Sequence, residues 1–145
     1  MRTASALPPA LVGLGVFSLT EAVLADVSPE RLRRSDIERL AQGFYALRDS
    51  EPDHVTIATA VCRNYANTWR SGPTGGMARG LALPESIAPA RPEVSRQRPG
   101  NLPRLALVTG HRAQVKLGEV SRIGKIPAST PARVWLELAR SLTVR

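Results

Sequence analysis

The sequence has little of the residue chemistry that disulfides and metal sites need. It contains one cysteine, Cys62, and two histidines, His54 and His111, among 145 residues. A single cysteine excludes an intramolecular disulfide and a cysteine-rich zinc site, and the two histidines do not have the spacing of a metal-binding motif. We therefore expect no metal ion. A cysteine-poor chain is typical of the reducing cytoplasm, where we expect this protein to be.

Long hydrophobic runs are also missing. No run of about 18 apolar residues occurs, so we predict no transmembrane helix and no membrane partner. The N-terminal segment has some signal-peptide character, with Arg2 before an apolar stretch and a small-residue site at 23–25. Pro8 and Pro9 interrupt that stretch, and residues 18–25 are better explained as a helix.

Recognisable catalytic patterns are absent as well. The chain has no G-x-S-x-G serine motif and no Gly-Lys-Ser/Thr phosphate loop, and its carboxylates are dispersed. Lys116 and Lys125 lack the acidic residue two positions earlier that a restriction-type nuclease strand carries. His111 follows Gly110 in a predicted turn, where we expect it to be solvated. We therefore predict no catalytic residues, no cofactor and no enzymatic activity.

Positive charge is present in excess. The chain has 20 basic and 12 acidic residues, a net charge of +8. Residues 1–49 contain six of each sign, so the whole excess lies in residues 50–145. This balance suits a polyanion such as nucleic acid or an anionic membrane surface, and an acidic protein is equally allowed.

The clearest local pattern is a pair of short helices. Ser18 and Glu21 form a capping-box pattern that predicts a helix ending near Ala25. Asp26 then tolerates a left-handed helix stop. Ser28 as N-cap and a proline at the first helical position predict a second helix, Pro29–Ser35. This spacing is typical of a helix-turn-helix.

A predicted β-hairpin follows directly. The runs 37–40 and 44–47 flank Gly43, which supplies the positive φ of a tight turn. A hairpin after a recognition helix is a wing, so residues 18–47 are predicted to form a winged helix-turn-helix. We expect the arginines of the second helix to spread over its exposed surface, which in most proteins is simply a solvated face. The candidate DNA-binding residues are Ser28, Arg31, Arg33, Arg34, Arg39 and Gln42.

The remaining chain predicts a second, less regular unit. Apolar spacing predicts a helix over 54–69, with Asp53 as N-cap and Cys62 in its buried face rather than acting as a nucleophile. Residues 71–92 are expected to be mostly loop, with a short helix at 77–83. Predicted strands are 93–96, 104–109, 113–117 and 120–126, and a final helix covers 130–142. The predicted fold class is α+β, with a winged helix-turn-helix domain at 1–49 and a small basic α+β domain at 50–145.

These segments resemble the AbiEi-type antitoxins, the regulators of bacterial type IV toxin–antitoxin systems. The residues that carry the resemblance are Leu7–Ala10, Gly15–Ala22, Val27–Asp36, Leu40–Leu47, Ser129–Arg133 and Leu136–Arg140. The resemblance implies that the winged helix binds inverted repeats in double-stranded DNA upstream of its own operon. It also implies a functional link to a nucleotidyltransferase-like toxin.

Two alternatives stay open from the sequence. Many relatives continue into an endonuclease-like domain of the very-short-patch-repair type, so the chain could be the regulatory N-terminal portion of such a protein. Winged helices also serve as protein-interaction modules, and the neutral charge of residues 1–49 is compatible with that role.

Overall fold

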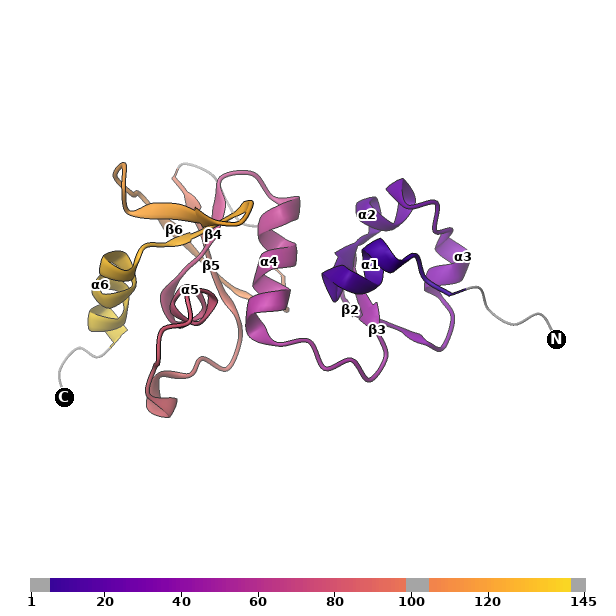
Figure 1. The fold of residues 1–145 in the computed structure, drawn as a ribbon, viewed down its shortest axis with the longest axis horizontal. Coiled ribbons are helices and arrows are strands. Elements are labelled where there is room, and N and C mark those ends of the chain that lie inside the picture. Colours follow the sequence, from indigo (N-terminus) through magenta and orange to yellow (C-terminus); the bar gives the residue numbers. More distant parts are fainter. Residues whose placement is uncertain (1–5, 99–104, 142–145) are drawn as a thin grey trace.

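The computed structural model describes residues 6–98 and 105–141 (Figure 1). These residues form a mixed α+β fold with six α-helices, one 3-10 helix and two β-sheets, which confirms the predicted α+β class. None of these helices has the length and apolar character that crossing a bilayer requires. The elements are α1 (Pro9–Leu14), β1 (Val16–Ser18), α2 (Leu19–Leu24), α3 (Pro29–Leu32), β2 (Ile37–Ala41), β3 (Phe44–Leu47), α4 (His54–Asn64), β4 (Thr68–Arg70), α5 (Gly72–Ala78), η1 (Glu85–Ile87), β5 (Glu93–Gln97), β6 (Thr109–Ala113), β7 (Val120–Ile123), β8 (Ile126–Ser129) and α6 (Pro131–Ser141).

The first sheet is antiparallel, with strand order β1-β3-β2. Its central strand brings Tyr45 opposite Phe17 on β1 and opposite Arg39 on β2. Gly43 in the β2–β3 turn has φ +81°, so the predicted left-handed glycine is confirmed. β1 was not predicted, because a three-residue strand carries too little periodicity to detect.

The two faces of the first sheet pack against different partners. On one face Phe17 and Ile37 join a buried cluster with residues of α1–α3. On the other face Val16, Phe44 and Ala46 pack with residues of α4. The first sheet therefore lies between α1–α3 and α4.

The predicted helix 54–69 is wrong at its C-terminal end. Asp53 caps the helix as expected, with its Oδ1 accepting from the Thr56 N–H at 2.8 Å. The helix ends at Asn64, Asn67 has a positive φ of 56°, and Trp69 lies in β4. An apolar residue at helical spacing also suits a buried strand, so periodicity alone could not separate the two.

The second sheet is mixed, with strand order β6-β5-β4-β8-β7. Figure 1 shows α4 beside this sheet and α5 between α4 and α6, and α5 packs against both helices. The predicted strand 93–96 is confirmed by β5. The predicted strands 104–109 and 113–117 are replaced by one strand, β6, and the predicted strand 120–126 is two strands joined at Gly124, which has φ +63°. Residue 104 lies outside the described residues, as does Leu142 of the predicted last helix.

Residues 71–83 also differ from the prediction. The expected loop at 71–76 is helix α5, and the expected helix at 77–83 is mostly irregular. The reason is close packing. A Cβ on Gly75 would lie 2.8 Å from the Arg70 carbonyl oxygen, and one on Gly76 would lie 3.2 Å from Val134 of α6. These glycines let α5 approach its neighbours rather than form a turn.

Candidate nucleic-acid interface

The two short N-terminal helices are held by the caps that the sequence predicts. The Ser18 hydroxyl accepts from the Glu21 N–H at 3.0 Å, and the Glu21 carboxylate accepts from the Ser18 N–H at 3.0 Å. Asp26 has φ +61°, the left-handed stop expected there. Ser28 accepts from the Arg31 N–H at 3.2 Å and so opens α3. These four local predictions are confirmed.

Helix α3 is shorter than predicted. It covers Pro29–Leu32, and residues 33–36 continue as turns up to β2. Its only leucine, Leu32, is buried as expected. The shortening moves Arg33 and Arg34 from a helix face onto the connection between α3 and β2.

The expected exposure of Arg31 is wrong. Its side chain is buried and makes a two-pronged contact with Asp36, at 2.8 Å for each nitrogen–oxygen pair. The hydrogen bonds from Arg31 are the largest influence on Asp36 and lower the pKa of that carboxyl. Arg31 therefore ties α3 to the start of β2 and is a poor candidate for contact with a ligand.

An arginine-lined hollow separates α3 from the β2–β3 hairpin. It has a volume of about 560 Å³, and its lining includes Arg33, Arg39 and Arg48 but no carboxylate. Arg33 and Arg39 are exposed at its rim. Arg48 donates from its Nε to the Ser35 carbonyl oxygen at 2.6 Å. The full lining is Leu19, Pro29, Leu32, Arg33, Ile37, Arg39, Tyr45 and Arg48.

The hollow brings together two of the six predicted site residues. Arg33 and Arg39 line it, whereas Ser28, Arg34 and Gln42 are exposed but lie outside its lining. Arg48 was missed. Its position just after β3 could have indicated a role, because the end of this hairpin strand returns to the junction with α3.

The hollow has the chemistry of a phosphate-binding surface. Guanidinium groups bind phosphate oxygens by paired, charge-assisted hydrogen bonds. The lining carries three positive charges, and Tyr45 contributes a phenol beside them. Phe44 is buried, and the Tyr45 ring stacks on Phe17 with 6.2 Å between the ring centroids, so neither ring forms an open platform for a base.

Cys62 and His111, which the sequence also singled out, lie outside this interface. Cys62 is buried on α4, and its burial raises the pKa of the thiol to about 12, which agrees with a core residue. His111 is not in a turn. It lies on β6 with its Nε2 3.1 Å from the Glu93 carboxylate.

No protein-family model matches the chain, and no curated protein matches it.

Proposed function

We propose that residues 18–47 are a winged helix-turn-helix that binds double-stranded DNA. The support is the order of elements: α2, a short turn, α3 and then the β2–β3 hairpin. The observation that carries the proposal is the hollow at the junction of α3 and the hairpin, with Arg33, Arg39 and Arg48 in its lining and no carboxylate. Arg33 and Arg39 contact phosphates and set the register of the protein on the duplex.

The biological role we propose follows the resemblance to AbiEi-type antitoxins. The protein represses its own operon by binding inverted repeats, and it counteracts a nucleotidyltransferase-like toxin. The basic second unit adds sequence-independent attraction to DNA, since all of the excess charge lies in residues 50–145. The antitoxin part is tested separately from DNA binding by co-expression with the nucleotidyltransferase-like toxin of the same operon, where rescue of growth is expected.

The first test is fluorescence anisotropy with the upstream DNA of the gene and a scrambled duplex, over a range of salt. We expect the protein to prefer its own upstream duplex. The variant Arg33→Ala/Arg39→Ala should bind about ten to a hundred times more weakly at low salt, because it loses two phosphate contacts. The slope of log K against log salt should become shallower by about two, at roughly 0.9 per phosphate.

The matched control is Arg91→Ala/Arg98→Ala, which removes the same charge from exposed positions of the second unit. It should weaken binding only slightly and equally for the upstream and scrambled duplexes, because it reduces the general attraction to DNA but removes no contact in the hollow. If the control weakens binding as much as the test variant, binding belongs to the general basic surface and not to the hollow. Thermal unfolding of each variant verifies that it is folded.

One observation favours a second candidate, a protein-docking role for α2. Val23 and Leu24 are 56% and 80% exposed, which is unusual for neighbouring apolar residues on a short helix. Under this reading Val23→Ser/Leu24→Ser would abolish binding of a protein partner, whereas the arginine variant would not.

A further inference from the structure

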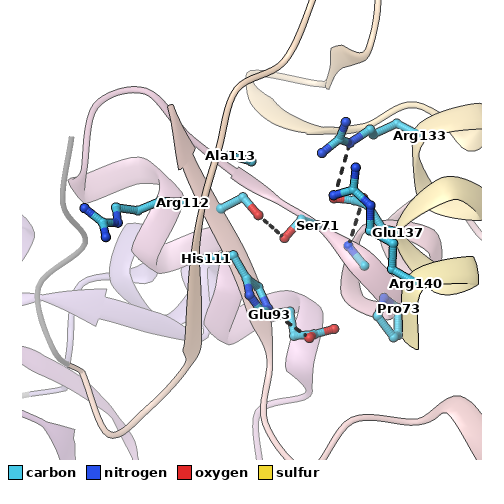
Figure 2. Close-up of a pocket in the computed structure, with 11 residues that line it drawn as sticks. Ser71, Pro73, Glu93, His111, Arg112, Ala113, Arg133, Glu137 and Arg140 are labelled. Atoms are coloured by element: carbon cyan, nitrogen blue, oxygen red, sulfur yellow. Dashed lines mark hydrogen bonds and ion pairs between the residues drawn. The ribbon is translucent and has the colours of Figure 1, made fainter. Parts of the chain in front are cut away.

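A second cavity lies in the other half of the molecule, between the second sheet and α6. Its volume is about 370 Å³, within the range of small-molecule sites. Figure 2 shows side chains of β5 and β6 on one side of it and of α6 on the other. The polar and charged residues of its lining are Ser71, Glu93, Ser95, His111, Arg112, Arg133, Glu137 and Arg140.

Two buried hydroxyls form one wall of this cavity. Ser71 and Ser95 are 1% and 2% exposed, and their Oγ atoms are 2.7 Å apart. Each hydroxyl has one proton, and a single bond between them uses one of the two. Among the described residues, nothing accepts the second proton. The pair therefore has a donor left for an oxygen in the cavity.

Arg133 on α6 supplies a second unused donor. Its side chain is 7% exposed, with Nη1 3.4 Å from Glu119. Its Nε is 3.6 Å from Glu137, too far for a hydrogen bond, and within the described residues this buried Nε has no hydrogen-bond partner. The guanidinium charge is paired with Glu119 and Glu137, but a buried N–H without a hydrogen bond is still costly, so a ligand oxygen at this place would be favoured.

The two carboxylates of the lining are already engaged by the protein. Glu93 contacts His111 at 3.1 Å, and Glu137 accepts from the Gly72 N–H at 3.2 Å. The hydrogen bond to Glu93 is the largest influence on His111 and raises the pKa of its imidazole, although burial opposes the shift. The donors that remain are the second hydroxyl proton of the Ser71–Ser95 pair and the Arg133 Nε.

We propose that this cavity binds the phosphate group of a small phosphate monoester. A phosphate monoester presents three oxygens in different directions, which suits donors that converge from the Ser71–Ser95 pair, from Arg133 and from His111. The rest of the cavity holds the organic part of the ligand. The site is separate from the proposed DNA-binding hollow, so the two can be lost independently.

The test is calorimetric titration of the full chain with inorganic phosphate, with AMP and with a 5′-phosphorylated oligonucleotide. His111→Gln and Ser71→Ala should each weaken AMP binding about tenfold or more, as expected for loss of one charge-assisted or buried hydrogen bond. His54→Gln is the matched control, because His54 is the only other histidine and lies outside the cavity lining. It should bind AMP like the unmodified protein.

The titrations are repeated in the Arg33→Ala/Arg39→Ala variant. This variant removes binding of the phosphate-bearing probes at the DNA-binding hollow, so that only the second cavity is measured. Absence of saturable binding by phosphate and by AMP at millimolar concentration would overturn the proposal, and so would equal affinity in all variants. Tightest binding by the oligonucleotide in the Arg33→Ala/Arg39→Ala background would overturn the small-molecule assignment and point to a strand end as the source of the phosphate.

Discussion

Gly15 and Gly43 share a positive φ but differ in the space around them. Gly43 at the hairpin turn has φ +81° and nothing within 4 Å of an added Cβ. Gly15 between α1 and β1 has φ +74°, and its added Cβ would lie 2.8 Å from the Thr56 methyl group of α4. The first position needs glycine for backbone conformation alone, whereas the second also needs it for close approach of α4.

Alanine at each glycine should separate these two effects. Gly43→Ala should lower the free energy of unfolding by about 1 kcal/mol through backbone strain. Gly15→Ala should lower it by about 2–3 kcal/mol, since overpacking adds to the strain. Adding Thr56→Ser to Gly15→Ala removes the methyl group. The loss of unfolding free energy should then fall to about that of Gly43→Ala. Urea unfolding of the unmodified protein and the three variants measures these free energies. An equal loss of unfolding free energy for Gly43→Ala and Gly15→Ala would contradict the close contact.

At the scale of elements, Glu21 joins α2 to α4. Besides its capping role it accepts from the Arg63 Nε at 2.9 Å and from the Asn64 amide at 3.0 Å. Arg63 also donates to the Val16 carbonyl oxygen at 2.7 Å. Burial alone would raise the pKa of Glu21, but the hydrogen bonds from Arg63, Asn64 and the Ser18 N–H together outweigh it and lower the pKa.

A double-mutant cycle of Glu21→Gln and Arg63→Met should show this link between elements. We expect a coupling free energy of about 1 kcal/mol near neutral pH, because both side chains are partly shielded from solvent. The folded-state pKa of Glu21 lies below its ordinary value of 4.5, so this stability is present above pH 4.5 and is lost as the pH falls through the folded-state value. Glu85→Gln, an exposed carboxylate on η1, is the control and should change little. A coupling that does not weaken in acid would exclude the ion pair as its source.

At the scale of the whole molecule, α4 is shared by the two halves. One core cluster contains Val16 and Phe44 of the first sheet, Val61 of α4, and Val94 and Val108 of the second half. It crosses the boundary predicted between residues 49 and 50. Removing α4 would expose the face of the first sheet that Val16 and Phe44 occupy.

The full chain should therefore unfold in a single transition. Tryptophan fluorescence reports on the second half, where Trp69 and Trp135 lie, and far-ultraviolet circular dichroism reports on both halves. The two transitions should coincide. A fragment of residues 1–49 should show no cooperative melting, because it lacks α4. Two separated transitions, or a folded fragment, would instead establish residues 1–49 and 50–145 as independent domains.

The sequence predicted those parts of the candidate site that depend on near neighbours. The caps of α2 and α3, the left-handed Asp26 and the hairpin at Gly43 were all expected and are found. The exposure of the arginines was predicted only in part. Arg31 and Arg33 are two residues apart, yet the first is buried against Asp36 and the second lines the hollow. Their spacing along a predicted helix could not indicate this difference, because α3 ends at Leu32 and Arg33 is not part of the helix.

By itself, then, the sequence determined the α+β class through its apolar patterns. It also determined where α2, α3, α4 and α6 begin and where the glycine turn lies, because caps and turns are set by groups three or four residues apart. Only the tertiary structure decided where α4 ends, that the glycine-rich segment is α5, and which arginines meet in one hollow. It also decided that Ser71, His111 and Arg133 surround one cavity. These features depend on packing between segments that are distant along the chain, and no local pattern encodes such packing.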